Sequence, residues 1–170
     1  PTVAIGFTAH RLVPLAAASR LIPGAGILIT GVVLLVADLS RLGGNKAARD
    51  ADYGSAMWIG ICQGLSVFPG LSRSGLTIST GLMGGFSRTF AVKYSYILSI
   101  PAVTGALVME LGEFAAPEMT VGMGFAYIFG MIISGVTGCF VIRFLLKIVQ
   151  KGKLRHFAYY CFFAGFVSLA

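Results

Sequence analysis

The sequence has 170 residues, of which 56% are hydrophobic and only 11% are charged. Soluble domains carry about a quarter of their residues as charged ones, so this composition, with a mean hydropathy of +0.87, excludes an ordinary soluble domain. The formal net charge of +7 comes from cations that cluster between apolar runs, as in the cytoplasmic loops of membrane proteins, and it indicates no nucleic-acid partner. We therefore expect an all-α integral membrane protein built as a multi-helix transmembrane bundle.

One membrane crossing takes about 20 mainly apolar residues, and the uncharged runs give the predicted segments in chain order. They cover residues 1–9, 21–37, 94–109, 119–142 and 157–170. The third run is expected to be interrupted at Pro101, and the fourth to end at Arg143. Because the first and last runs are cut within apolar sequence, we expect the chain, a single transmembrane domain over residues 1–170, to be a piece of a longer protein.

Residues 53–87 form an apolar stretch whose single charge is Arg73, too long for one crossing and too short for two. Cation-rich loops face the cytoplasm. Such cations stand on both sides of the stretch, at Arg41, Lys46, Arg49, Arg88 and Lys93. Both ends therefore belong on one side of the membrane, and we predict a re-entrant helix–loop–helix hairpin at about 53–87. Non-helical backbone at membrane depth must be buried in protein or line a wet cavity, so its tip predicts a site.

The predicted tip reads Pro69-Gly70-Leu71-Ser72-Arg73-Ser74-Gly75. Pro69 is expected to end the first half-helix and Ser74 to cap the second, whose N-terminus then attracts anions at membrane depth. A guanidinium can hold two phosphate oxygens at once, so Arg73 is the predicted clamp for a phosphate or diphosphate and, if the protein is an enzyme, its predicted catalytic residue. The predicted diphosphate-binding residues, which supply hydroxyls or close backbone approach, are Gly70, Ser72, Ser74, Gly75 and Thr77. Gln63, on the first half-helix, is expected either to support this site or to bond to another helix.

The apolar segments contain no Asp, Glu or His at mid-depth that could act as a general base or metal ligand, so these residues make a phosphate cradle without the rest of a hydrolase. From the residues alone, two other functions stay open. An anion or phosphate transporter would also use broken helices whose ends point at a midplane site. A non-catalytic membrane protein that binds lipid phosphate would need the cradle only.

The residues that point to a family are Gln63, the segment 69–75, and the run from Gly81 through Ser87-Arg88 to Ser99-Ile100-Pro101-Ala102. At these positions the sequence resembles the undecaprenyl-diphosphate phosphatase family, which is also known for bacitracin resistance. The resemblance implies a hydrolase of the bacterial inner membrane that removes the terminal phosphate of undecaprenyl diphosphate and so recycles the lipid carrier of peptidoglycan synthesis. It also implies an inverted-repeat fold with two re-entrant hairpins, of which these residues form a little more than one half.

The resemblance further implies a first motif, with paired glutamates and a histidine, that precedes the region seen here. A divalent cation, Mg²⁺ or Ca²⁺, is implied as well, with its ligands outside this region, so no metal ligand is assigned within residues 1–170. The implied partners are the polyprenyl diphosphate substrate and membrane lipid. The oligomeric state stays open, with a homo-oligomer as one alternative.

Overall fold

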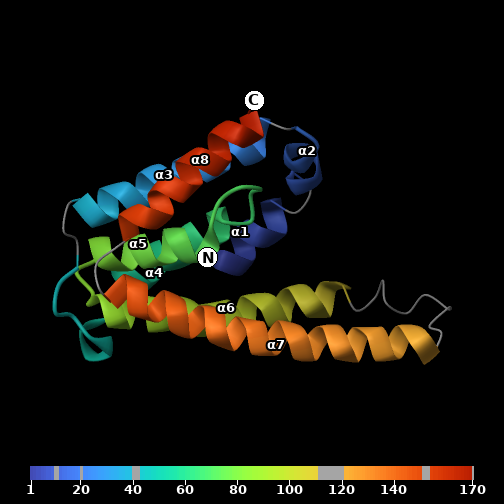
Figure 1. The fold of residues 1–170 in the computed structure, drawn as a ribbon. Coiled ribbons are helices and arrows are strands. Elements are labelled where there is room, and N and C mark those ends of the chain that lie inside the picture. Colours follow the sequence, from blue (N-terminus) through green and yellow to red (C-terminus); the bar gives the residue numbers. More distant parts are fainter. Residues whose placement is uncertain (10–11, 20, 40–42, 111–120, 151–153, 170) are drawn as a thin grey trace.

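The computed structural model describes residues 1–9, 12–19, 21–39, 43–110, 121–150 and 154–169. The described residues form α-helices and one 3₁₀ turn, so the prediction of an all-α membrane bundle is confirmed (Figure 1). In chain order the elements are α1 (Thr2–Ala9), α2 (Val13–Ala18), α3 (Leu21–Leu39), η1 (Ala48–Asp50), α4 (Tyr53–Leu65), α5 (Arg73–Met83), α6 (Arg88–Glu110), α7 (Val121–Gln150) and α8 (Leu154–Leu169).

Three of the described helices are long and apolar enough to cross a membrane: Leu21–Leu39 in α3, Arg88–Val108 in α6 and Gly124–Val149 in α7. The prediction that the span over 94–109 is interrupted at Pro101 is wrong, because Pro101 lies inside the continuous helix α6. Membrane helices tolerate an internal proline because neighbouring helices and hydroxyl side chains can satisfy the backbone groups that it frees.

Helix α7 is also longer than the sequence predicts, since it continues past Arg143 to Gln150. Its 30 residues span about 45 Å at 1.5 Å per residue, whereas the hydrocarbon core is about 30 Å thick. The charge at Arg143 ends the apolar run without ending the helix, because Lys147 in the last turn is favourable near the negative end of the helix dipole.

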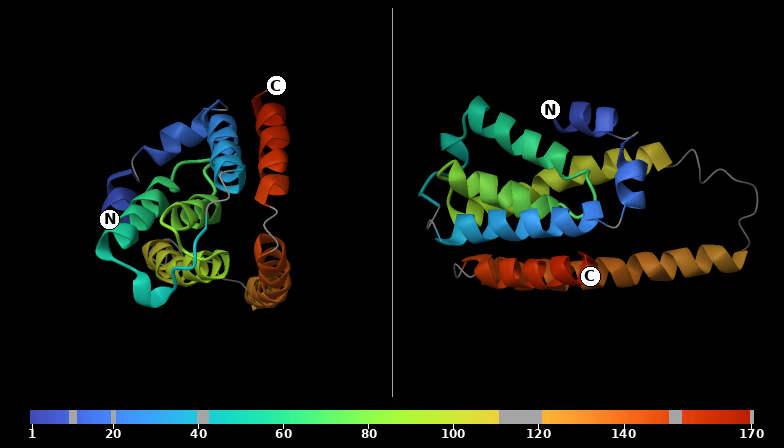
Figure 2. Two further views of the ribbon diagram at one scale, coloured as in Figure 1. Left: turned by 90° about the vertical axis from the view of Figure 1, so that its left-hand side faces the viewer. Right: turned by 90° about the horizontal axis from the view of Figure 1, so that it is seen from above.

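Helix α5 lies at the centre of the bundle and contacts α3, α4 and α6 (Figures 1 and 2). Around it, α3 lies beside α8, α6 beside α7, and α1 beside α4. Seven of the eleven residues of α5 are buried, among them glycines, Thr77 and Ser79. The centre of the bundle is therefore a short helix rich in small and hydroxyl-bearing residues, while the longer apolar helices surround it.

Helices α4 and α5 form the predicted hairpin, but α4 ends at Leu65 and not at Pro69. The hydroxyl of Ser66 donates to the Gln63 carbonyl at 2.6 Å, and Phe68 N–H donates to the Leu65 carbonyl at 3.2 Å. These short-range bonds satisfy the last carbonyls of α4, so the helix ends before the proline. At its other end, Asp52 caps α4 by accepting hydrogen bonds from Ser55, which lower the pKa of Asp52.

The two ends of the hairpin are tied together at one end of the bundle. A short strap before α4 runs beside the turn after α5, because Lys46 N–H donates to the Gly85 carbonyl at 3.3 Å and Ser87 N–H donates to the Lys46 carbonyl at 3.0 Å. The Lys46 ammonium also donates to the Gly84 carbonyl at 3.1 Å, at the C-terminus of α5. The chain thus enters and leaves the hairpin at the same end of the bundle.

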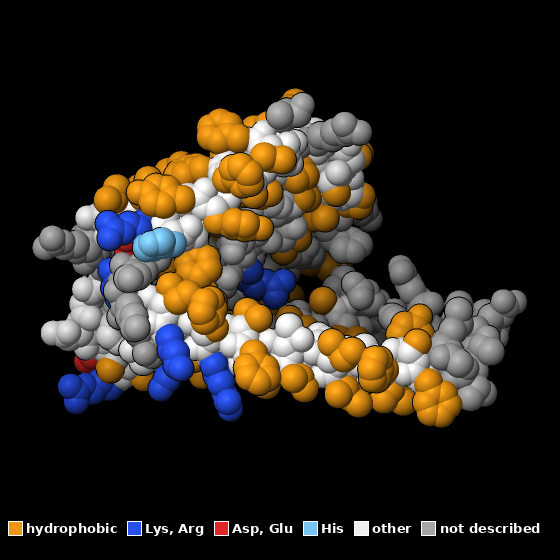
Figure 3. All heavy atoms as spheres, viewed as in Figure 1, with side chains coloured by type: hydrophobic (Ala, Val, Ile, Leu, Met, Phe, Trp, Pro, Cys, Tyr) orange, Lys and Arg blue, Asp and Glu red, His pale blue; other side chains and the backbone are white. Residues whose placement is uncertain are grey.

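The same end of the bundle carries a buried carboxylate that joins three helices. Asp38, near the end of α3, is 3.5 Å from the Arg88 guanidinium at the start of α6. It also accepts a 3.3 Å hydrogen bond from Arg155 N–H at the start of α8. Figure 3 shows Lys and Arg side chains gathered mostly toward this end and apolar side chains along the rest of α7. Cations gathered at one end and apolar side chains along the body are typical of a membrane protein.

Candidate functional site

The first residue of α5 is Arg73, and its N-cap is Ser72, so the prediction that Ser74 caps this helix is wrong. Ser72 has an extended backbone, with φ −75° and ψ 116°, and its hydroxyl accepts a 3.2 Å hydrogen bond from Gly75 N–H. A cap must be the last non-helical residue, whereas Ser74 already lies in the first turn. Its hydroxyl oxygen is 3.5 Å from that of Ser72, so the two hydroxyls lie together at the helix N-terminus.

The loop that precedes α5 rests directly on α3, backbone against backbone. Gly70 has φ +88°, and a Cβ there would lie 2.0 Å from the Pro23 carbonyl oxygen. A Cβ on Gly26 would lie 2.6 Å from the Pro69 carbonyl oxygen. Only glycine fits at either position, because both contacts are shorter than any side chain can accept. Gly70 was predicted as a diphosphate-binding residue; in the structure it lets the tip of the hairpin approach α3.

Thr30 of α3 holds this loop in place, and sequence reasoning missed it. Its hydroxyl accepts a 3.0 Å hydrogen bond from Ser72 N–H and donates to the Gly26 carbonyl at 3.0 Å. The side chain is 1% exposed. The available signal was the glycine content of the apolar run 21–37, because small residues in a membrane helix mark close contact with another segment.

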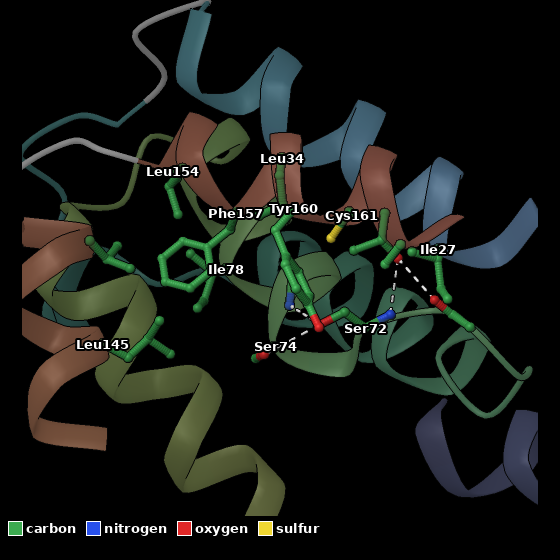
Figure 4. A pocket seen from close by; sticks show the side chains of 15 residues that line it. Ile27, Leu34, Ser72, Ser74, Ile78, Leu145, Leu154, Phe157, Tyr160 and Cys161 are labelled. Carbon is green, nitrogen blue, oxygen red and sulfur yellow. Dashed lines mark hydrogen bonds between the residues drawn. The ribbon is translucent and has the colours of Figure 1, made fainter. Parts of the chain in front are cut away.

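A cavity of about 350 Å³ opens beside the tip, between α3, α5, α7 and α8. Gly70, Ser72, Ser74 and Gly75 line it together with Thr30, and apolar side chains form the rest of its wall. Figure 4 shows Ser72 and Ser74 on one side and Leu145, Leu154 and Phe157 on the other. The cavity therefore has a polar side and an apolar side, which suits a molecule with a polar head and an apolar chain.

Arg73 is partly buried at the first position of α5, next to the two serines. Within the described part of the chain, its guanidinium has neither a hydrogen bond nor an ion pair, and it does not line the cavity beside Ser72 and Ser74. An arginine without a carboxylate partner, at the N-terminus of a helix, retains all its donors for an anion.

Two other predicted residues face away from this cavity, toward α6. Thr77 is 2% exposed, and its hydroxyl contacts the Ser95 hydroxyl of α6 at 2.6 Å. Gln63 is 3% exposed and donates from Nε2 to the Leu98 carbonyl of α6 at 3.3 Å, the interhelical bond that was one of its two predicted roles. Its Oε1 atom is buried and has no hydrogen-bond partner in the part of the chain that the structure describes. Of the predicted set, the structure brings Gly70, Ser72, Ser74 and Gly75 together around the cavity, with Arg73 adjacent.

The donors around the cavity are hydroxyl and backbone N–H groups, which suit an anion and not a metal ion. Among the described residues, no three His, Cys, Asp or Glu side chains gather where they could hold a metal. The residues present therefore do not fit the divalent cation that the family resemblance implies. That cation stays a prediction, and no step is derived through it.

Comparison with known proteins gives a consistent set of relatives. A family model described as bacitracin resistance protein BacA matches residues 1–167. The undecaprenyl-diphosphatase of Desulforapulum autotrophicum is 37% identical over 171 residues, which cover 99% of this chain and 60% of that protein. The undecaprenyl-diphosphatases of Korarchaeum cryptofilum and Desulfatibacillum aliphaticivorans are 38% and 40% identical over 100% and 97% of this chain, or 62% and 59% of their own lengths. The chain thus spans about 60% of the length of these curated relatives.

Proposed function

Because the chain belongs to the bacitracin resistance protein BacA family, we propose that the full-length protein is a membrane hydrolase that removes the terminal phosphate of undecaprenyl diphosphate. The observation that carries the proposal is the tip of the hairpin, where Arg73, which has no partner among the described residues, stands beside the hydroxyls of Ser72 and Ser74 at a helix N-terminus. The choice of substrate rests on the relatives of this chain, which are named undecaprenyl-diphosphatase.

In the proposed reaction, water attacks the terminal phosphorus and the bond from that phosphorus to the bridging oxygen breaks. The products are undecaprenyl phosphate and inorganic phosphate. Phosphoryl transfer depends mainly on positioning and on stabilising charge on the transferred group. Ser72, Ser74 and the N-terminus of α5 hold phosphate oxygens. Arg73, which lies next to the two serines but outside the cavity lining, turns toward the bound phosphate and neutralises the charge that grows on it. We assign no general base among the described residues.

The two-sided cavity supports a lipid substrate. Its polar side, at Ser72 and Ser74, takes the phosphate end, while the apolar wall formed by α7 and α8 receives the first isoprenoid units. Burying these units contributes roughly 25 cal/mol for each Å² of apolar surface removed from water. A phosphate transporter would need no such apolar wall beside its anion site, so the cavity favours the lipid substrate.

The proposed location is the inner membrane of a bacterium, with several crossings and with the Asp38–Arg88 end in the cytoplasm. The product, undecaprenyl phosphate, returns to the cycle that carries peptidoglycan precursors. A homo-oligomer stays a prediction.

The deciding experiment uses the purified full-length protein in detergent and in liposomes. We expect inorganic phosphate to be released from undecaprenyl diphosphate, and no flux of phosphate across liposomes that contain the protein. Flux without release would identify a transporter and overturn the proposal. Binding of the lipid diphosphate with neither release nor flux would identify a non-catalytic lipid-binding protein.

A further inference from the structure

Helices α5 and α6 meet along a narrow seam of small and hydroxyl-bearing residues. A Cβ on Gly81 would lie 3.2 Å from the Ala91 Cβ, and one turn away the hydroxyls of Thr77 and Ser95 are 2.6 Å apart. The partners are spaced by four residues on both helices and run in opposite order, so the two helices are antiparallel with these residues on their facing sides. The seam leads from the end of α5 back toward its first residue, Arg73.

The Thr77 hydroxyl lies between the backbone of Arg73 and the hydroxyl of Ser95. The Thr77 hydroxyl donates to the Arg73 carbonyl at 2.8 Å. By geometry alone either oxygen could donate in the bond that joins the two side chains. A threonine hydroxyl has one hydrogen to donate, so when that hydrogen lies on the Arg73 carbonyl the Ser95 hydroxyl is the donor to Thr77. A chain of two hydroxyls therefore runs from Ser95 of α6 through Thr77 to the first turn of α5, where the Arg73 carbonyl is nearer, at 2.8 Å, than the Ser74 carbonyl, at 3.4 Å.

The Ser95 hydroxyl bonds to a neighbouring helix, whereas two other hydroxyl residues of α6 bond within their own helix. Ser99 donates to the Tyr96 carbonyl at 2.6 Å, and Thr104 donates to the Ile100 carbonyl at 2.9 Å, so both bond within α6. Ser95, only 5% exposed, bonds across to α5. A buried hydroxyl without a partner is unfavourable. The Ser95 hydroxyl has its partner in the Thr77 hydroxyl of α5, the helix that begins with Arg73.

We infer that Ser95 is a positioning residue for Arg73 and acts through the hydroxyl of Thr77. The first residue of a helix has no intrahelical partner for its N–H and belongs to the part that frays. The bond from the Thr77 hydroxyl to the Arg73 carbonyl limits this freedom. It thereby fixes the position of the Arg73 backbone, from which the side chain with the guanidinium extends. Thr77 then serves the site through the Arg73 backbone and not through its own contact with phosphate. The inference rests on the proposed function, because it takes Arg73 as the group that binds the diphosphate.

The test measures phosphate release from undecaprenyl diphosphate by the full-length protein and four variants. Ser95→Ala and Thr77→Val remove a hydroxyl of the chain, and each is expected to lower kcat about tenfold, because small misplacement of a positioned group costs up to about 100-fold. Thr77→Ser keeps the hydroxyl and recovers most of the kcat that Thr77→Val loses. Thr80→Val is the matched control. Thr80 makes the same 2.8 Å bond to a carbonyl within α5, that of Leu76, but bonds to none of the described side chains of α6.

A second arm separates positioning from a general structural role. In an Arg73→Lys background, Ser95→Ala should lower kcat less than about twofold, because groups that act as a unit are not additive. A tenfold loss in both backgrounds would overturn the inference, as would a kcat in Ser95→Ala equal to that of the unsubstituted protein. If Ser95→Ala does not fold, judged by size-exclusion and thermal unfolding, the comparison of Thr77→Val with Thr77→Ser decides the question.

A third arm keeps this inference distinct from the proposed function. Binding of inorganic diphosphate is measured by calorimetry for the same proteins. If the unsubstituted protein releases no phosphate, the proposed function fails. The inference then stands if Ser95→Ala weakens diphosphate binding about tenfold only in the presence of Arg73, and it fails if binding is unchanged. A protein that neither hydrolyses the lipid nor binds diphosphate would contradict both.

Discussion

The hydroxyl of Thr30, in the middle of α3, accepts a 3.0 Å hydrogen bond from the backbone N–H of Ser72, the residue that caps α5. The Thr30 side chain is 1% exposed, and its own hydrogen goes to the Gly26 carbonyl. One side chain of a membrane-spanning helix thus fixes the backbone from which the candidate site begins. The position of the candidate site therefore depends on a residue of another helix, α3.

Thr30→Val keeps the shape of the side chain but removes the acceptor for Ser72 N–H. We expect it to lower the free energy of unfolding by about 1–3 kcal/mol, because a buried N–H would lose its partner. Thr30→Ser keeps the hydroxyl and should cost less than Thr30→Val. Thermal unfolding in detergent measures both, and equal losses for the two variants would show that the hydrogen bond is unimportant.

Gly26→Ala places a methyl group 2.6 Å from the Pro69 carbonyl oxygen, so α3 and the hairpin must move apart. We expect a loss of about 1–3 kcal/mol, as for other overpacked contacts, with a parallel loss of activity. Gly130→Ala on α7 is the matched control, since nothing lies within 4 Å of the added Cβ. It should be neutral or stabilising by up to about 1 kcal/mol, because alanine favours a helix. Similar unfolding temperatures for the two variants would contradict the contact.

Arg73→Ala should reduce phosphate release by about 10³-fold or more, by analogy with other arginines that stabilise phosphoryl transfer. Arg73→Lys keeps the charge but cannot hold two phosphate oxygens at once through a planar guanidinium. It should recover only a small part of the rate. Arg49→Ala, which removes an arginine whose side chain is 89% exposed, is expected to leave the rate unchanged. Normal turnover in a folded Arg73→Ala protein would remove Arg73 from the catalytic assignment.

Asp38→Asn weakens the pairing with Arg88 at the end of the bundle where α3, α6 and α8 meet. The Asp38 side chain is 8% exposed, so we expect a loss of about 1–3 kcal/mol in the free energy of unfolding, as for a hydrogen bond to a buried charge. Asp50→Asn is the comparison, since its pairing with Arg49 is exposed and should contribute less than about 1 kcal/mol. Denaturant titrations in which both variants lose the same stability would count against the role of Asp38.

The hairpin was predictable because its signal lies in the sequence itself. A stretch of the wrong length for one or two crossings, with Arg73 as its single charge and cations on both sides, leaves little choice of topology. The gathering of Gly70, Ser72, Ser74 and Gly75 also follows, since they are consecutive or nearly so in one turn. Local sequence is enough where the contacts are local.

The roles of Thr30 and Ser95 could not be predicted, because each depends on a partner more than 15 residues away. A hydroxyl in an apolar run bonds by default to its own helix, and only the packing of α3 and α6 on α5 shows where these two reach. The cap at Ser72 instead of Ser74 was missed for a smaller reason. Both serines can cap a helix, and the choice depends on the loop conformation that Thr30 and Gly70 impose.

The strap at Lys46 that runs beside Phe86 bears on how the chain is inserted during its synthesis. The insertion machinery meets residues 53–87 as an apolar stretch long enough to be taken for a crossing. If it were left as one, α6, α7 and α8 would all be placed upside down, with the cations at Arg88 and Arg155 on the wrong side. The bonds of the strap form only when both ends of the hairpin stay on the same side, so they stabilise the correctly oriented product after both ends have been made.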